Sequence, residues 1–334
     1  MRRYLVTGGL GFLGAPLVRA LVRDGHRVRV LDNGSRGNAT RLGDVQDQVE
    51  LVTGDIRDAE LVGRALQGIE AVCHLAFVNG TRHFYERPGH VLEVGVKGMI
   101  NVIEGCGRAG VRQLYLASSS EVYQRPSSIP TDETVSLVVP DPHNPRYSYG
   151  GAKIISELLA LHWGREWLER IVIFRPHNVY GPDMGWEHVI PQLTARILQV
   201  QRQAGGEQEL AVPIQGSGTQ SRAFIYIDDF IDGLLRVIEH GAHLAIYHIG
   251  TTEEVQIREV AQRIAQCLGV RIRVVPGPQA VGGTDRRCPD IRKLQALGFS
   301  PKVTWPDGLK RTVAWYASHV HPSELEAAAT AQEA

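Results

Sequence analysis

A tyrosine and a lysine four residues apart are the first candidates for chemistry in this chain. Tyr149 and Lys153 belong to the segment YGGAK at the expected start of a helix, and side chains at i and i+4 share one helix face. A lysine cation beside a tyrosine stabilises the phenolate and lowers the pKa of the phenol, so Tyr149 would be a general base near neutral pH. The same spacing also occurs on helix faces whose tyrosine and lysine have no joint role.

Three serines and a glutamate form the second candidate group. Ser118, Ser119 and Ser120 come directly after an apolar run, and Glu121 follows them. If that run is a strand of a parallel α/β sheet, its carboxyl end faces the ligand crevice, where a hydroxyl can hydrogen-bond a substrate oxygen. A run of serines is also an ordinary loop start. Both groups therefore depend on the elements that surround them.

The most informative element is the glycine-rich segment TGGLGFLG at residues 7–14. It follows the apolar run 4–6 and opens a helical apolar pattern, which is the context of a dinucleotide-binding turn. Gly8 and Gly11 allow a tight turn and a close approach of the backbone to a pyrophosphate. Gly14 allows the helix to pack on the sheet, and the helix N-terminus offers N–H groups to phosphates.

An acidic residue ends the next apolar run, Val28–Leu31. Asp32 at this strand end can accept hydrogen bonds from an adenosine ribose and would repel a 2′-phosphate. The pattern therefore favours NAD over NADP. Glycine-rich turns alone occur in many loops, but the strand, the helix and Asp32 together favour a cofactor site over a bare tight turn.

Apolar runs alternate with helical patterns through residues 1–180, which predicts an α/β fold with a doubly wound (Rossmann) parallel sheet and an NAD-binding domain. The expected strands are Arg3–Thr7, Val28–Leu31, Glu50–Thr53, Ala71–Ala76, Gln113–Ser118 and Ile171–Arg175. The expected helices are Phe12–Asp24, Ala59–Gln67, Val91–Ala109 and Ala152–Glu169.

Prolines break the pattern after residue 180, so we expect residues 181–320 to form a smaller, irregular α/β lobe that closes over the crevice, where substrate would bind. Its expected helices are His188–Gln203, Asp228–Glu239, Arg258–Leu268 and Asp307–Ser318, and its expected strands are Ala245–Ile249 and Arg271–Val275. Residues 321–334 are rich in alanine and glutamate and are expected to form a flexible tail.

The composition excludes several classes of partner. The 334 residues carry 36 basic and 36 acidic side chains, a balance that favours neither nucleic acid nor an anionic membrane. The four cysteines have no CxxC spacing, so we expect no metal site and reduced thiols. No apolar run reaches membrane-spanning length and no signal peptide precedes the first strand, so a cytoplasmic protein is expected.

Several motifs in one order resemble the extended short-chain dehydrogenase/reductase family, and within it the nucleotide-sugar epimerases, dehydratases and decarboxylases. The resemblance covers residues 3 to about 316. The segments that carry it are TGGLGFLG, Asp32, Gly54-Asp55-Ile56, His74-Leu75-Ala76, SSSEVY, YGGAK, RPHNVYGP from Arg175, GSGTQSRAFIYIDD from Gly216, and RRCPDI from Arg286.

The resemblance implies a set of NAD contacts. The glycine loop, with Phe12 and Leu13, would hold the pyrophosphate, and Lys153 would reach the nicotinamide ribose as well as assisting Tyr149. The other implied cofactor residues are Asp32 and Asn33 at the adenosine ribose, Asp55 and Ile56 at the adenine, and Leu75, Ala76 and Pro176 along the groove.

The resemblance also implies the catalytic and substrate residues. Tyr149 would be the base and Ser119 its hydroxyl partner, with Ser120 beside the substrate. Asn178 would lie by the substrate diphosphate, with Arg222 and Arg287 as its cationic clamp, because a guanidinium pairs bidentately with phosphate.

The chain departs from the family pattern at three positions. Gly95 stands where relatives often have an asparagine near the nicotinamide, which puts one cofactor contact in doubt. Gln124 replaces the glycine that usually follows the Val-Tyr pair. His177 adds an ionisable group beside the substrate path, or is a core histidine.

Glu121 bears on the type of reaction. Plain 4-epimerases of the family mostly carry a small neutral residue there. The Ser-Ser-Glu turn of this chain instead resembles the Thr-Ser-Glu of sugar 4,6-dehydratases and of UDP-glucuronate decarboxylases. A carboxylate at this position can take the C5 proton once C4 is a ketone, or it holds the loop.

We therefore expect an NAD-dependent nucleotide-sugar epimerase that acts through a 4-keto intermediate and recycles its NAD. A 4,6-dehydratase or a UDP-glucuronate decarboxylase using Glu121 is the alternative. A simple NAD-dependent dehydrogenase is less favoured, because the arginine clamp would have no ligand. A non-catalytic binding protein is disfavoured by the presence of Ser119, Tyr149 and Lys153. The expected partners are a nucleotide-diphosphate sugar and a second copy of the chain, as a homodimer.

Overall fold

The centre of the structure, a computed structural model that describes residues 1–205, 208–278 and 283–320, is a seven-stranded sheet. Every strand pair in it is parallel. Its order is β11-β6-β5-β4-β1-β2-β3, which confirms the doubly wound α/β fold. The strands are β1 (Arg3–Thr7), β2 (Arg27–Asp32), β3 (Val49–Thr53), β4 (Ala71–His74), β5 (Gln113–Ala117), β6 (Arg170–Pro176) and β11 (Ala245–Ile249).

Side-chain alternation along the strands builds two apolar layers, one on each face of the sheet. Tyr4 and Val6 pack in the cluster that contains residues of α1 (Gly14–Arg23) and α8 (Ile227–His240). Leu5, between them, packs in the opposite cluster with α2 (Ala59–Ala65) and α5 (Gly98–Ala109). Successive residues of a strand point to opposite faces, so both faces of the sheet are covered by helices.

The helix that carries the tyrosine and the lysine starts earlier than predicted. It is α6 (Tyr147–Leu158), followed by a π-type turn, Leu159–Trp163, and a short 3-10 turn, Gly164–Glu166. The predicted helix Ala152–Glu169 was therefore wrong at its start, and both Tyr149 and Lys153 lie inside the helix.

The predicted helix Val91–Ala109 is also interrupted. It is divided into α4 (Pro88–Leu92), a π-type turn, Glu93–Lys97, and α5. At the start of α5, Gly98 packs so closely on Ile56 that a Cβ would lie 2.3 Å from its Cδ1. Apolar periodicity tolerates such a turn, which is why the sequence pattern did not show it.

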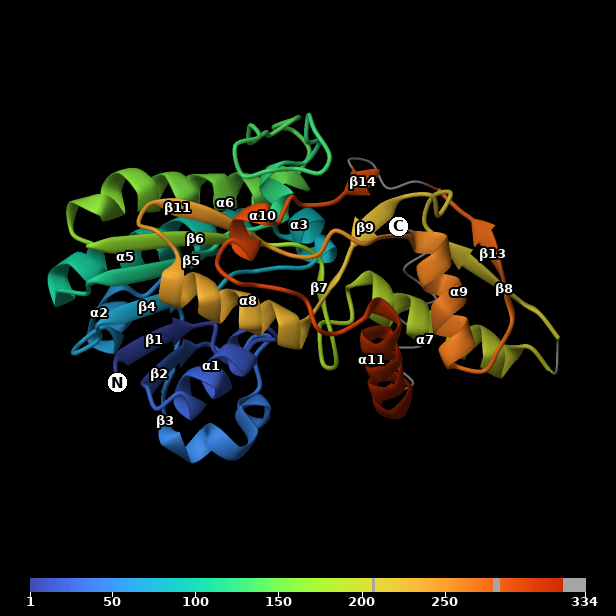
Figure 1. Ribbon diagram of the computed structural model, residues 1–334, viewed down its shortest axis with the longest axis horizontal. Coiled ribbons are helices and arrows are strands. Elements are labelled where there is room, and N and C mark those ends of the chain that lie inside the picture. Colours follow the sequence, from blue (N-terminus) through green and yellow to red (C-terminus); the bar gives the residue numbers. More distant parts are fainter. Residues whose placement is uncertain (206–207, 279–282, 321–334) are drawn as a thin grey trace.

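The smaller lobe lies to the right in Figure 1, beyond the carboxyl end of the sheet. Its helices are α7 (Val189–Gln203), α9 (Ile257–Cys267) and α11 (Trp305–His319), and the parallel pair β8 (Leu210–Ile214) and β13 (Ile272–Pro276) lies beside them. Three short strands, β9 (Ser221–Ala223), β12 (Glu254–Gln256) and β14 (Arg286–Arg287), form a further sheet. Further short elements are β7 (Val179–Tyr180), β10 (Ile225–Tyr226), α3 (Thr81–Glu86) and α10 (Arg292–Gln295), together with 3-10 segments at Ala39–Gln48 and Ser120–Val122.

Two elements expected in this lobe, β11 and α8, belong with the main sheet instead. β11 pairs along its length with β6, from Ala245 opposite Val172 to Ile249 opposite Pro176. The segment after residue 180 thus supplies the last strand of the sheet, and α8 packs on β6 and β11. The predicted tail at 321–334 lies outside the described residues.

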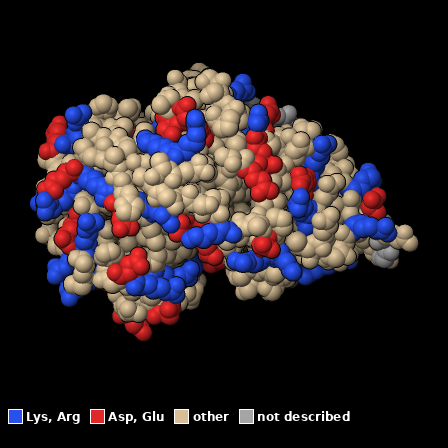
Figure 2. All heavy atoms as spheres, in the orientation of Figure 1, with Lys and Arg blue, Asp and Glu red and all other residues tan. Residues whose placement is uncertain are grey.

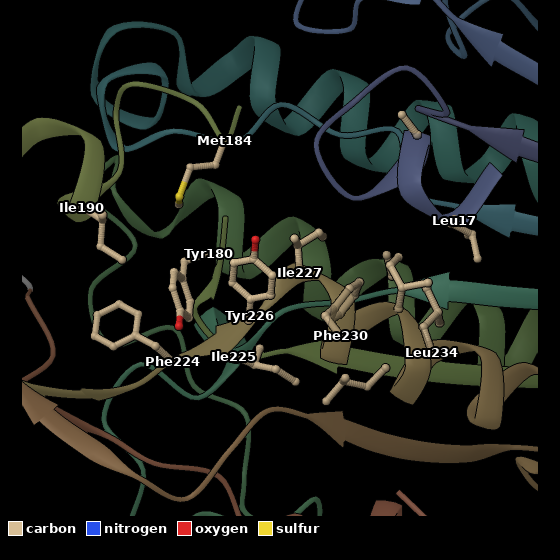
Figure 3. Close-up of a cluster of buried hydrophobic side chains, with 14 of the residues drawn as sticks. Leu17, Tyr180, Met184, Ile190, Phe224, Ile225, Tyr226, Ile227, Phe230 and Leu234 are labelled. Atoms are coloured by element: carbon tan, nitrogen blue, oxygen red, sulfur yellow. The ribbon is translucent and has the colours of Figure 1, made fainter. Parts of the chain in front are cut away.

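An aromatic cluster joins the lobe to the sheet (Figure 3). Tyr180 contacts the rings of Phe224 and Tyr226, at centroid distances of 6.0 and 5.5 Å. Phe224 stacks on Trp305 at 4.7 Å. These residues belong to the same buried cluster as the strand residue Tyr4, so the lobe and the sheet share one continuous core.

A buried ion pair connects α6 to β6. Arg175 donates from Nε and Nη2 to the Glu157 carboxylate at 2.8 and 2.6 Å, and both side chains are 2% exposed. Ser118 donates to the same carboxylate, and Arg175 donates to the Tyr123 hydroxyl. The pair therefore holds both ends of the segment that carries Ser119, Ser120 and Glu121.

The charged side chains on the face seen in Figure 2 are of both signs and interspersed. Among the described helices, none has the length and apolarity to cross a membrane. Within the described residues, no three His, Cys, Asp or Glu side chains lie close enough together to hold a metal ion.

We expect Glu157→Gln to lower the free energy of unfolding by about 3–5 kcal/mol, because it leaves the Arg175 charge buried without its partner. Urea unfolding followed by circular dichroism measures this loss. Glu104→Gln, which removes an exposed pair with Arg108, is the control and should change stability by at most about 1 kcal/mol. Equal losses in the two variants would contradict the role given to the buried pair.

Candidate functional site

The glycine loop forms a cradle that side chains would fill. Gly8 has a φ of +71°, and a Cβ on it would lie 2.7 Å from the backbone nitrogen of Ala76. A Cβ on Gly14 would lie 2.1 Å from the Gly8 carbonyl oxygen. No side chain caps the N-terminus of α1 at Leu13. The loop therefore leaves this helix end for an anionic group, as a dinucleotide pyrophosphate requires.

Asp32 lies buried at the carboxyl end of β2, beside this loop. Its carboxylate accepts hydrogen bonds from the backbone N–H groups of Leu10, at 3.0 Å, and Gly34, at 2.9 Å. The Asn33 amide donates to Asp55 at 3.2 Å. The Asp55 carboxyl in turn pairs with Arg57, whose hydrogen bonds lower its pKa to about 2.

The other predicted cofactor residues lie along the same edge of the sheet. Ala76 donates its N–H to the Thr7 hydroxyl at 3.2 Å, and Leu75 donates to the Thr7 carbonyl at 3.1 Å. The carbonyl of Ile56 accepts a hydrogen bond from the Asn101 amide at 2.9 Å. Pro176 ends β6, and the ring of Phe12 lies near the Gly181 backbone. These residues line one continuous edge, so they fit NAD.

Tyr149, Ser119 and Lys153 come together beneath this edge. The Ser119 hydroxyl lies close enough to that of Tyr149 to favour its ionised form and so to lower its pKa. Lys153 donates from Nζ to the Ala117 carbonyl oxygen at 2.7 Å, and Nζ lies 5.8 Å from the centre of the Tyr149 ring. All three side chains are at most 9% exposed. The structure thus joins the two candidate groups of the sequence into one site.

Burial shifts the pKa values of both Tyr149 and Lys153. It raises the pKa of Tyr149 to about 12, opposed by the hydrogen bond from Ser119 and by the charges of Arg36 and Arg287. Burial also lowers the pKa of Lys153 to about 7, opposed by the Glu157 carboxylate. The expectation of a lowered tyrosine pKa was wrong for the chain without cofactor, because desolvation outweighs the nearby positive charges.

Two phenylalanines enclose the tyrosine. Phe84 of α3 stacks on the Tyr149 ring at 4.8 Å, and Phe77 meets it edge-on at 5.1 Å. Phe77 also lies under the Lys153 ammonium, with 3.8 Å from Nζ to the ring centre. Sequence reasoning missed both residues. The aromatic residue directly after His74-Leu75-Ala76 was the only signal for Phe77.

The Glu121 carboxylate forms an ion pair with an arginine. Arg287 donates from Nη1 to its Oε1 at 2.9 Å, and the charges of Arg146 and Arg222 also lie near. Although burial alone would raise the pKa of Glu121, these arginines together lower it below its ordinary value. The carboxylate is therefore ionised at neutral pH. Arg146 is a further residue that the motifs did not single out.

The two predicted clamp arginines lie side by side. Arg222 of β9 is opposite Arg287 of β14 in a parallel pair. The Arg222 guanidinium donates to the carbonyl oxygens of Ser221 and Thr284, and burial, followed by the charge of Arg287, lowers its pKa to about 9. Two adjacent like charges are a suitable site for a substrate diphosphate.

Three further predicted residues are placed around this clamp. Asn178 has a φ of +41° and donates from its amide to the Ala223 carbonyl at 3.0 Å, beside Arg222. Ser120 is buried in the short turn before Glu121. His177 is buried, its ring packs edge-on against His248, and burial holds its pKa well below the usual value. His177 is therefore a neutral interior histidine.

Together the fold and these side chains define a dinucleotide-binding protein of the short-chain dehydrogenase/reductase type. The profile of the NAD dependent epimerase/dehydratase family matches residues 4–250, and the chain belongs to this family. The protein is therefore NAD-dependent, and the relatives act on nucleotide sugars.

Proteins that resemble this chain to a similar degree are named for three different reactions. A UDP-N-acetyl-alpha-D-glucosaminuronate decarboxylase of Bacillus cytotoxicus is 29% identical over 325 residues, 94% of this chain and 98% of the relative. The crystal structure of a dTDP-glucose 4,6-dehydratase from Streptomyces venezuelae, with NAD bound, is 32% identical, with a TM-score of 0.83 over 95% of this chain and 97% of that one. The structure of a Thermotoga maritima UDP-glucose 4-epimerase with UDP-glucose is 27% identical, with a TM-score of 0.83 over 96% and 100%.

We expect Asp32→Ser to narrow the preference for NAD over NADP by about tenfold or more. The substitution removes the carboxylate that we expect to accept hydrogen bonds from the adenosine ribose and to repel a 2′-phosphate. Dissociation constants of both dinucleotides, measured by calorimetry, test this. Asp44→Ser, which removes an exposed carboxylate paired with Arg23, is the control. Tighter binding of NADP by the unaltered protein would overturn the role of Asp32.

Proposed function

We propose that this protein is a nucleotide-sugar epimerase that acts through a transient 4-keto intermediate and retains its NAD between turnovers. One observation carries the proposal. The Tyr149 hydroxyl lies beside Ser119, which favours its ionised form, whereas the Glu121 carboxylate is paired with Arg287. The site thus has a proton acceptor for a sugar hydroxyl, and its second carboxylate is engaged elsewhere.

The chemistry requires a proton acceptor and a hydride acceptor at one carbon. When bound, NAD supplies the acceptor, and later the donor, of the C4 hydride. Tyr149 takes the proton of the 4-hydroxyl while the C4–H bond breaks, and the C4–O bond becomes a ketone. The sugar then turns its other face, C4 receives the hydride again, and Tyr149 returns the proton. Net oxidation is zero.

Proton transfer to Tyr149 requires its phenolate form, which nearby positive charges stabilise. With a pKa of about 12, the phenol is protonated in the chain alone. Lys153 and the charges of Arg36 and Arg287 favour the phenolate, and Ser119 donates to it. A general base must be close in pKa to the operating pH, so the bound cofactor and these charges together must lower the pKa of Tyr149.

The arginine pair supports a diphosphate substrate. Arg222 and Arg287 lie opposite each other on β9 and β14, and Asn178 meets β9 at Ala223. We propose that they bind the diphosphate of a nucleotide sugar, with Ser119 and Ser120 at the sugar. The proposed NAD contacts are those of the glycine loop, Asp32, Asn33 and the groove residues described above.

A dehydratase or a decarboxylase that uses Glu121 is the second candidate. Glu121 is ionised, and it lies two residues after Ser119, to whose hydroxyl its backbone N–H donates at 3.1 Å. A ketone at C4 makes the C5–H bond acidic, and in this second candidate the Glu121 carboxylate takes the C5 proton. Loss of water or of carbon dioxide would then follow instead of rotation.

We also propose that two copies of the chain associate through the outer face of α6 and the neighbouring α4. Ile155 and Leu158 of α6 and Leu92 of α4 are 39%, 50% and 39% exposed. The two helices pack on each other, so these apolar side chains belong to one region of the surface.

We expect Tyr149→Phe to lower turnover by ~100- to 10,000-fold, the usual contribution of a general base, while NAD stays bound. The ring still packs between Phe77 and Phe84, but no oxygen accepts the proton. Turnover of a panel of UDP- and dTDP-sugars, with the bound NAD quantified after denaturation, measures both effects. Tyr147→Phe, on the same helix, is the control. A Tyr149→Phe variant that retains a tenth of the activity would show that another group is the base.

Solvent deuterium distinguishes the two candidate functions. A 4-epimerase returns the same hydride to C4, so product formed in D2O should carry no deuterium at any ring carbon, and Glu121→Gln should remain active. Label at C5, together with a 6-deoxy-4-keto sugar or a pentose and carbon dioxide, would instead show dehydration or decarboxylation. In that case Glu121→Gln should abolish the exchange. NMR of the product reads both positions.

A further inference from the structure

The ring of Phe77 lies in a space that Gly95 leaves open. A Cβ on Gly95 would be 2.4 Å from Cζ of Phe77 and 3.0 Å from the Ala152 Cβ. The first distance is far inside van der Waals contact, so any side chain at position 95 would displace the ring. Gly95 lies in the π-type turn between α4 and α5, and Phe77 follows β4. The Phe77 ring can therefore occupy this space only because residue 95 is a glycine.

The ring that fills this space carries the Lys153 ammonium on its face. Nζ lies 3.8 Å from the ring centre, well within the range in which an aromatic face attracts a cation. An ammonium has three donors. One of them binds the Ala117 carbonyl at 2.7 Å, and the aromatic face covers another side. The lysine is thus held in one place and keeps a donor for the cofactor.

The other groups that face Lys153 position its ammonium less strongly than Phe77 does. Glu157, one turn further along α6, shares its carboxylate between Arg175 and Ser118. His74 of β4 is neutral at ordinary pH, because burial and Lys153 lower its pKa to about 3. Tyr149 meets the edge of the Phe77 ring at 5.1 Å. Phe77 therefore contacts both the ammonium and the phenol.

We propose that Phe77 is a positioning residue for Lys153, whose ammonium it holds beside Tyr149 by its aromatic face, in a space that Gly95 keeps clear. The proposal concerns the lysine and is independent of which sugar reaction follows. It also accounts for Gly95, since an aromatic ring occupies the place that a side chain at this position would take.

The state of Lys153 can be measured without turnover. The chain has only five lysines, so protein labelled with [ε-13C]lysine should give a resolvable set of titrating signals, with Lys153 assigned by Lys153→Met. An aromatic face favours the charged form, so Phe77→Leu should lower the pKa of Lys153 by about one unit. In the rate profile, the loss of activity at high pH should move to lower pH by a similar amount.

Three variants separate this role from general packing. Phe84→Leu removes the other ring on Tyr149 but no contact with Lys153, and should leave the lysine pKa unchanged. Phe77→Tyr keeps the aromatic face and should also leave it unchanged. Gly95→Ala displaces the ring and should shift the pKa in the same direction as Phe77→Leu.

Each outcome decides the proposal. A lysine pKa that is the same in the unaltered protein, Phe77→Leu and Gly95→Ala would overturn it, as would an equal shift in Phe84→Leu. If Phe77→Leu fails to fold, Phe77→Met retains an unbranched apolar side chain of similar length and takes its place in the comparison. Failure of the epimerase proposal would change the product of the reaction but not this titration.

Discussion

Arg175 and Glu157 place two opposite charges in the interior where β6, α6 and the serine turn meet. Taking such charges out of water is costly, and the pair is stable only because every part of it is bonded. Ser118 and Tyr123 supply the remaining hydrogen bonds, so the turn between them is held at both ends. Lys153 lies one helical turn before Glu157. This one ion pair therefore ties together the serine turn and α6, the two segments that carry the catalytic side chains.

The electrostatics of the site follow from burial more than from any single contact. Tyr149 and Lys153 are buried and Glu121 is partly buried, and desolvation disfavours the charged form of each. Arginines on the lobe reverse this tendency for Glu121, whereas Tyr149 remains a phenol in the chain alone. In the mechanism proposed here, the charges of bound ligands are needed before Tyr149 can accept a proton. Ligand binding and proton transfer are therefore coupled.

Local sequence patterns were enough to predict how the proposed cofactor residues are arranged. The rest of the site depends on contacts between residues far apart in the chain, which such patterns do not encode. The glycine loop and Asp32 belong to one β-α-β segment, so their spacing alone indicated their arrangement. The contact between Arg287 and Glu121 joins residues 166 positions apart, and no local pattern encodes it. The π-type turn around Gly95 was missed because the apolar periodicity continues through it. Phe77 was missed because its role depends on the rotamer of a ring and not on its place in a motif.

The late strand β11 has a consequence for how the chain folds during synthesis on the ribosome. β6 is the edge of the sheet until Ala245–Ile249 pairs with it, and an uncovered edge strand is a template for aggregation. The cofactor-binding half therefore cannot be completed when its own residues have emerged. It must wait until translation has passed residue 249, and a nascent chain of intermediate length has an open edge for chaperones to protect.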